Sequence, residues 1–294
     1  MGRKQNKTAS DADAAKEKET VEVVEKAEAL MNQFPKSDMY FQAKAMADTD
    51  NISAREQYEL FKEGATEDGC IHCMWRMGKM TMKTPDGKCM QIHLALPWFL
   101  EGAIRGSVRC IVTLMNECYN NRGKKTNALL DYWGKITKRN KLPNLGLNKL
   151  KHHLGRKCVI CSKTDTKTLT LQQCIGCSFY CYCSEGCQTI HWKEHKHRNE
   201  CKQVQILNKY HKPYAKEIRD AVIRGDKEIP SLEKLRYKLG LTRPQEEYDE
   251  FYKLKPTHNG NPIDPYDYLT GREDGTVWVG SVPNSPIGSS RGNT

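Results

Sequence analysis

The sequence CIGCSFYCYCSEGCQTIHWKEHKHRNEC at residues 174–201 contains six cysteines and three histidines, and CVIC at residues 158–161 adds two cysteines just upstream. Eleven possible metal ligands therefore lie within 44 residues of a 294-residue chain that has thirteen cysteines. The N-terminal residues lack the apolar core that a secretory signal needs, so we expect a reducing, intracellular location, cytoplasmic or nuclear. In such a location, clustered cysteines with C-x2-C spacing favour metal binding over disulfides.

The spacing of these residues divides them into four pairs. The C-x2-C pairs at 158–161 and 174–177 are typical of zinc knuckles, in which two thiolates on a tight turn reach one tetrahedral ion. The pairs at 183–187 and 197–201 have the i, i+4 spacing that places two side chains on one face of a helical turn. Four pairs supply eight ligands, which predicts two zinc ions.

Three histidines compete for one ligand position. His197 precedes Cys201 by four residues and would share a helix face with it. His195 precedes Cys201 by six residues, which rotates it by about 240° at 3.6 residues per turn. Helix geometry therefore favours His197, and His195 is the alternative if this turn is not helical. We expect His191, early in the same segment, to be exposed.

The pattern C-x2-C-x12-C-x2-C-x5-C-x3-C-Q, followed by Trp, His and Cys, resembles the MYND-type zinc finger. The resemblance covers residues 158–201 and rests on YC at 182–183, CQ at 187–188 and HW at 191–192. It implies two zinc ions that are bound in an interleaved order. The first ion would be bound by Cys158, Cys161, Cys183 and Cys187, and the second by Cys174, Cys177, His197 and Cys201.

Interleaving ties early parts of the segment to late ones, so the metals replace a hydrophobic core that 44 residues cannot supply. Cys181 has no place in the pattern, and we expect it to be a free thiol. An ion with four protein ligands has no open position for a reacting water. Both sites are therefore predicted to be structural, and the protein is not expected to be an enzyme.

The resemblance also implies a function, that of an adapter that binds proline-containing peptides of partner proteins. Gln188 and Trp192 would form the contact, with an aromatic surface suited to a polyproline II ligand. The alternative for Trp192 is packing against the zinc core.

The sequence leaves two alternative functions, a lysine methyltransferase and a nucleic-acid-binding finger. Some SET-domain lysine methyltransferases carry a MYND insertion, but they need an Asn-His motif downstream, and here His258-Asn259 has the reverse order. A nucleic-acid-binding finger would suit the net charge of +11 and the basic sequence KEHKHRNEC. That sequence contains no regular set of base-reading residues, so any such binding is expected to be non-specific.

An internal repeat precedes the finger. FKEGATEDGCIHCMWRMG begins at Phe61 and FLEGAIRGSVRCIVTLM begins at Phe99, with matches at offsets of 38 and 37 residues, and NALLDYWGKI at residues 127–136 is a partial third unit. Such periods are typical of stacked helical hairpins. The Gly-Ala pairs and the following glycine resemble Sel1-like repeats, which are related to tetratricopeptide repeats.

Cysteines also occur within this repeat. Cys73 and Cys110 occupy a repeat position that usually holds a small residue, so we expect buried structural thiols there. The alternative is a second metal site, whose ligands would be Cys70, Cys73, Cys89, His72 and His93.

Composition completes the predicted organisation. Apolar residues make up 38% of the chain and charged residues 28%, with a mean hydropathy of −0.75, which is typical of small folded units joined by solvated segments. No apolar run is long enough to span a membrane. We predict a mostly α protein with a helical-hairpin repeat region, a small two-zinc finger, flanking helices and disordered ends. The predicted segments are a charged N-terminal segment with a partly free helix (1–51), the Sel1-like repeat region (52–137), a basic linker (138–157), the finger (158–201), C-terminal helices (202–255) and a disordered tail (256–294).

Overall fold

The computed structural model describes most of the chain between residues 25 and 242 and two short segments nearer the C-terminus. The described ranges are 25–47, 54–83, 91–121, 124–139, 156–195, 197–242, 270–271 and 277–278. Helices predominate in these ranges, and the strands form three short antiparallel pairs. The predicted mostly α fold is confirmed for the described part of the chain.

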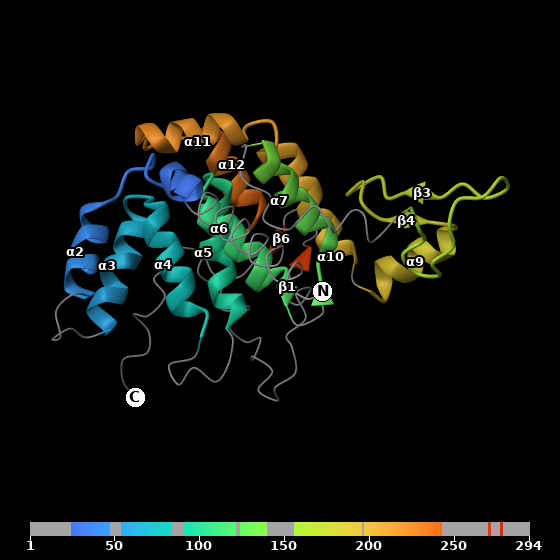
Figure 1. Ribbon diagram of the computed structural model, residues 1–294, viewed down its shortest axis with the longest axis horizontal. Coiled ribbons are helices and arrows are strands. Elements are labelled where there is room, and N and C mark those ends of the chain that lie inside the picture. Colours follow the sequence, from blue (N-terminus) through green and yellow to red (C-terminus); the bar gives the residue numbers. More distant parts are fainter. Residues whose placement is uncertain are drawn as a thin grey trace, which may run out of the picture.

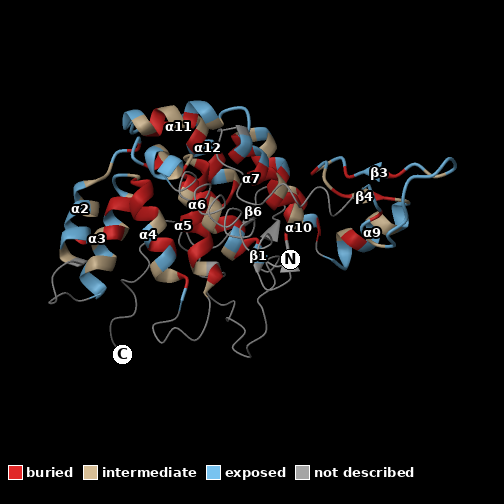
Figure 2. Ribbon diagram, viewed as in Figure 1, coloured by how far each residue is buried: buried red, intermediate tan, exposed pale blue. Residues whose placement is uncertain are grey.

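A small segment with two short strands projects from one end of a body of helices (Figure 1). We call the described residues from 25 to 139 and from 202 to 242 the helical body, and residues 156–201 the finger. Helix α10 (His197–Ile206) begins in the finger and continues into the helical body, so the boundary that we predicted after residue 201 falls inside a helix. Buried residues gather where the helices of the body face one another (Figure 2).

The first part of the helical body consists of consecutive helical hairpins. Helix α2 packs against α3, α3 against α4, α4 against α5, and α5 against α6. The buried residues of α3 recur at the i, i+3, i+4 spacing of one helix face. These helices are α2 (Asp38–Ala47), α3 (Ala54–Thr66), α4 (Ile71–Thr81), α5 (Ile92–Ile104) and α6 (Val108–Thr113).

Equivalent glycines allow close packing inside two of these hairpins. A Cβ atom at Gly64 of α3 would lie 2.7 Å from the Sγ atom of Cys73 in α4. A Cβ atom at Gly102 of α5 would lie even closer to the Sγ atom of Cys110 in α6. The two halves of the repeat therefore fold as helical hairpins of the same construction.

The turns of the two hairpins also match. Gly69 lies between α3 and α4 with φ of 63°, and Gly106 lies between α5 and α6 with φ of 95°. These values fall in the left-handed region that favours glycine because it has no Cβ atom. Each of these glycines thus forms the turn between the two helices of its own hairpin, at equivalent positions of the two sequence units.

The cysteines of the hairpins are buried as predicted. Cys73 and Cys110 are fully buried, and Cys70 is nearly so. Cys89 lies outside the described residues, as does the side chain of His93. Within the described chain, no metal-binding group of three or more ligands includes Cys70 or Cys73.

The remaining helices of the body follow on both sides of the finger in sequence. A π-helical turn, η1, and a short strand pair lead into α7, whose face packs against α10. A second π-helical turn, η2, continues α10. Helix α11 ends at Gly225, which has φ of 78°. The elements are η1 (Leu114–Cys118), β1 (Asn120–Asn121), β2 (Lys124–Lys125), α7 (Asn127–Arg139), η2 (Leu207–His211), α11 (Ala215–Arg224) and α12 (Pro230–Lys238).

A buried ion cluster joins the last helix to the hairpins. Glu101 of α5 is fully buried, and its Oε1 atom lies 2.8 Å from Nη2 of Arg105 and 2.9 Å from Nε of Arg236 in α12. Burial opposes a charge on Glu101, but the two guanidinium groups outweigh it and hold the pKa of this carboxyl below its usual value. The cluster fixes α12 against α5.

The structure describes only short parts of the two ends of the chain. The tail at 256–294, predicted to be disordered, contains the antiparallel pair β5 (Thr270–Gly271) and β6 (Val277–Trp278), which packs against α10. The rest of that tail, most of the predicted linker at 138–157 and residues 1–24 lie outside the described residues. Residues 25–31 are helical. None of the described helices is both long enough and apolar enough to cross a membrane.

Candidate metal centres

The finger consists of two knuckle turns, one strand pair and one short helix before α10. The strands are β3 (Gln172–Gln173) and β4 (Cys181–Tyr182), and the helix is α9 (Glu185–Lys193). Ser184 caps α9, because its Oγ atom accepts a hydrogen bond from the N–H of Cys187 at 3.3 Å. This cap starts the helix where Cys183 and Cys187 can face the same side.

The two C-x2-C knuckles have the same backbone geometry. Ser162 follows the first knuckle with φ of 60°, and its N–H donates to the carbonyl of Cys158 at 2.9 Å. Ser178 follows the second with φ of 54°, and its N–H donates to the carbonyl of Cys174 at 2.8 Å. Positive φ is uncommon for residues other than glycine. The strained turn brings the two thiols of each knuckle together.

The first quartet joins the first knuckle to the start of α9. Its Sγ atoms all lie within 4.8 Å of one another, with 3.3 Å between Cys161 and Cys183 and 3.6 Å between Cys183 and Cys187. Cys158, the fourth member, is buried, whereas Cys161 is exposed and the other two are half-buried. A parallel backbone β-bridge between Cys158 and Cys181, which is not a disulfide, holds the knuckle beside β4.

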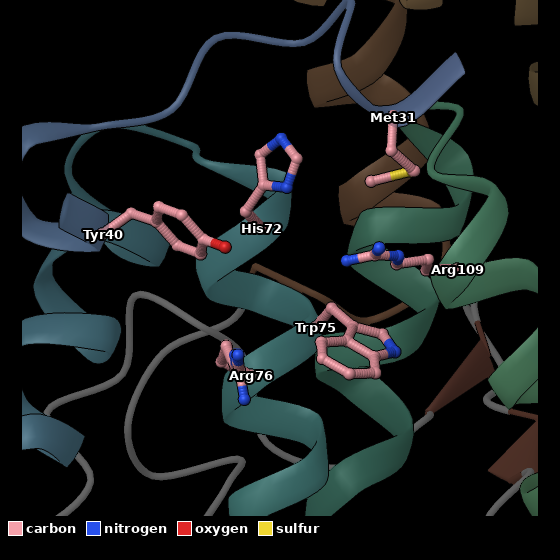
Figure 3. A pocket seen from close by; sticks show the side chains of 6 residues that line it. All are labelled: Met31, Tyr40, His72, Trp75, Arg76 and Arg109. Carbon is pink, nitrogen blue, oxygen red and sulfur yellow. The ribbon is translucent and has the colours of Figure 1, made fainter. Parts of the chain in front are cut away.

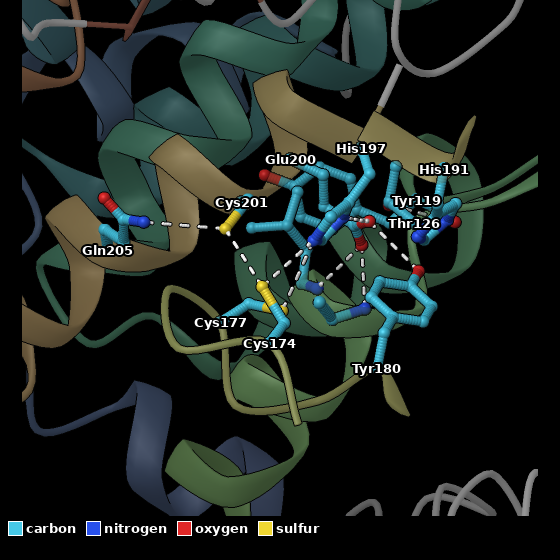
Figure 4. Close-up of polar contacts among 12 residues, drawn as sticks. Tyr119, Thr126, Cys174, Cys177, Tyr180, His191, His197, Glu200, Cys201 and Gln205 are labelled. Carbon is cyan, nitrogen blue, oxygen red and sulfur yellow. Dashed lines mark hydrogen bonds and ion pairs between the residues drawn. The ribbon is translucent and has the colours of Figure 1, made fainter. Parts of the chain in front are cut away.

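The second quartet joins the second knuckle to α10 (Figure 4). Nε2 of His197 lies 3.5 Å from Sγ of Cys174 and 3.6 Å from Sγ of Cys177, and the Sγ atoms of Cys174 and Cys201 are 3.7 Å apart. All four residues are buried.

Both quartets fit zinc. Ligand atoms about 2.3 Å from a tetrahedral ion lie about 3.7 Å from one another, close to the 3.3–3.7 Å between the ligand atoms here. The cysteines of both quartets are free, not disulfide-bonded. Sulfur and imidazole ligands in closed sets of four are typical of structural zinc. The finger thus has the ligands for two structural zinc ions.

The three histidines have different environments. His197 begins α10 and belongs to the second quartet, whereas His195 precedes the helix and is exposed. The expectation that His191 is exposed is wrong. It is buried, its ring stacks on that of His197 with 4.6 Å between centroids, and it forms a 2.8 Å hydrogen bond with the hydroxyl of Tyr182. Burial lowers the pKa of His191 to about 3, so the ring is neutral.

Cys181 lies outside both quartets, as the pattern indicated. It is half-buried in β4, and burial raises the pKa of its thiol.

Sequence reasoning missed Glu200, which is fully buried beside the second quartet. Its Oε2 atom lies 3.5 Å from Nδ1 of His197 and accepts a 3.0 Å hydrogen bond from the hydroxyl of Tyr180. Its Oε1 atom accepts hydrogen bonds from the backbone N–H groups of Ala128 and Leu129 at 2.7 and 3.3 Å. The available signal was an acidic residue one helical turn after a histidine ligand, which is a usual position for a carboxylate that orients it.

The predicted peptide contacts lie on α9. Gln188 and Trp192 are both half-buried, and the Trp192 ring meets the His197 ring edge-on with 5.8 Å between centroids. The finger also exposes apolar side chains that the sequence did not single out. Ile175, in the second knuckle, is 97% exposed, and Ile190 of α9 is 37% exposed.

The helical body has a small hollow of its own (Figure 3). Its volume is about 10 Å³, roughly the space for one water molecule. Two guanidinium groups lie within 6 Å of an indole ring there, and that of Arg109 also forms an ion pair with Glu28 at 3.3 Å. The lining residues are Met31, Tyr40, His72, Trp75, Arg76 and Arg109.

The fold and the site define a class of protein: one that carries a compact zinc finger with two interleaved structural sites on a helical body. The family model for the MYND finger matches residues 158–205, so this segment is a MYND-type zinc finger. The match extends four residues beyond the last ligand, into the part of α10 that enters the helical body. Comparisons with curated proteins and with solved structures found no match.

Proposed function

We propose that this protein is a non-catalytic adapter that binds partner proteins through its MYND-type finger, in the cytoplasm or the nucleus. The observation that carries the proposal is the completeness of both quartets. Four protein ligands leave no position on either ion for water or substrate. Zinc then stabilises a surface and takes no part in chemistry.

The surface of the finger supports binding to a peptide. Gln188 and Trp192 are four residues apart on α9, so they share one side of the helix. Both are partly accessible, and Trp192 is held against the ring of a zinc ligand, which fixes its orientation. A rigid aromatic side chain of this kind suits a proline-containing ligand in polyproline II conformation.

The helical body would act as the scaffold. We propose that its matched hairpins are degenerate Sel1-like repeats, on the basis of the paired glycines and thiols at equivalent positions. Repeats of this kind present extended surfaces to partners. A rim with two arginines, such as that of the hollow in Figure 3, would suit an acidic segment.

The test is binding of the full chain to an array of proline-containing peptides. Trp192→Ala should lower the affinity for these peptides at least tenfold, because the aromatic ring that contacts them is removed. It should keep two zinc ions per chain, because all eight zinc ligands remain. Tyr237→Ala, which removes an exposed aromatic ring from the helical body, is the matched control and should bind as the wild type does. Equal binding by wild type and Trp192→Ala would exclude the peptide contact.

A further inference from the structure

The N-terminal turn of α7 is capped by a residue from the finger. The first N–H groups of a helix have no partner within the helix. The side chain of the residue before the helix usually accepts a hydrogen bond from one of them. Here that residue is Thr126, but its hydroxyl donates to the carbonyl of Tyr119 at 3.4 Å. The N–H groups of Ala128 and Leu129 donate instead to Glu200, which is 72 and 71 residues away in sequence.

The same carboxylate faces the second zinc quartet. His197 presents Nε2 to the thiols of that quartet and Nδ1 to Oε2 of Glu200 (Figure 4). An imidazole that binds a metal through Nε2 carries its proton on Nδ1 and can donate it to an oxygen. Nδ1 of His197 is buried and makes no hydrogen bond to any residue that the structure describes, and the Glu200 carboxylate lies 3.5 Å from it. Zinc at Nε2 would fix the ring so that its Nδ1–H group faces this carboxylate.

Burial makes this arrangement sensitive to the loss of a partner. Glu200 and His197 are both 0% exposed, so water cannot replace a contact that is lost. A carboxylate that is buried without its full set of hydrogen bonds is strongly disfavoured. The positive end of the α7 dipole also favours this anion at the helix N-terminus.

We propose that Glu200 is a positioning residue that couples zinc binding at the second quartet to the order of the N-terminal turn of α7. Zinc at this site is then part of the fold of the helical body as well as of the finger. Within the described part of the chain, no hydrogen bond or ion pair joins a ligand of the first quartet to the helical body, and three of these ligands are partly or fully exposed. This coupling does not depend on the proposed peptide binding.

Hydrogen exchange of the full chain tests the coupling directly. Removing both ions with a chelator should speed exchange of the amides of Ala128 and Leu129 at least tenfold, with a smaller change in α3 and α4. Cys161→Ser, which should lose only the first ion, should leave these two amides protected. Unchanged protection after loss of the second ion would overturn the proposal. So would an equal loss of protection in α3 and α4, because that would indicate global unfolding.

The reverse effect gives a second measurement, since coupling between two events is reciprocal. Glu200→Gln keeps the shape of the side chain. It should lower the affinity of the chain for one of its two zinc ions about tenfold, measured in competition with a chelator. Glu194→Gln makes the same change at an exposed position of the finger and should leave both affinities unchanged. Equal zinc affinities in wild type and Glu200→Gln would count against the link. Neither measurement uses a peptide, so failure of the proposed peptide binding would leave both informative.

Discussion

The two zinc quartets have the same spacing rule but different surroundings. The first has one buried ligand and three that are half-buried or exposed, and it connects only segments of the finger. The second is fully buried and uses α10, which continues into the helical body. Two metal sites in one finger, one with four cysteines and one with three cysteines and a histidine, can therefore have unequal structural roles. One closes the finger, and the other attaches the finger to the rest of the chain.

The largest expected difference comes from removing one ligand at each site. Cys174→Ser should lose the second ion and lower the free energy of unfolding by about 4 kcal/mol or more, because it leaves a buried, incomplete quartet. Cys161→Ser should lose the first ion, with an effect on the helical body of less than about 1 kcal/mol. Zinc content and denaturant unfolding, followed by helical circular dichroism, measure both. Equal losses of stability would contradict the comparison.

Two glycines of the finger sharpen the contrast. A Cβ atom at Gly176 would come well within 3.0 Å of Gln205 Nε2 and Cys201 Sγ, whereas the nearest atom to a Cβ at Gly186 is Ser184 Oγ at 3.8 Å. Gly176→Ala should therefore lower the free energy of unfolding by about 1–3 kcal/mol through overpacking at the second quartet.

Gly186→Ala is the matched control for that substitution. It lies in the first turn of α9 beside the first quartet, where alanine favours the helix by up to about 1 kcal/mol. The control should be neutral or more stable in the same unfolding experiment. If Gly176→Ala were equally harmless, the packing between the second knuckle and α10 would be looser than the structure has it.

The metal quartets were predictable because their information is local. A C-x2-C pair and an i, i+4 pair each fix the relation of two neighbouring side chains, and helix geometry favoured His197 over His195. The hairpin repeat was also visible, since each unit repeats its own glycine and cysteine positions.

The long-range contacts were not predictable. Glu200 meets α7 across 72 residues, and no periodicity identifies which helix packs on which face. His191 was assigned to an exposed face because the sequence does not show that Tyr182 of β4 packs against α9. The β5–β6 pair lies in a stretch whose composition is typical of disorder, and its packing against α10 depends on the folded body.

The smallest expected effect concerns the body side of the second quartet, where η2 continues α10. His211 is buried there, with its Nδ1 atom 2.7 Å from the hydroxyl of Tyr132. Burial lowers its pKa from 6.5 to about 4, so the folded protein keeps the ring neutral while the unfolded chain protonates it below about pH 6.5. Stability is then complete above pH 6.5 and falls as the pH decreases toward 4.

Between pH 7 and 5.5, this histidine alone should cost the folded state about 1 kcal/mol. His211→Gln should remove that part of the pH dependence, measured by denaturant unfolding with zinc in excess at both pH values. The same substitution at the exposed His195 serves as the control and should leave the slope as in the wild type. An unchanged slope in His211→Gln would mean that water reaches this ring. The packing of η2, which continues α10 beyond the second quartet, would then be looser than expected if this quartet attaches the finger firmly to the helical body.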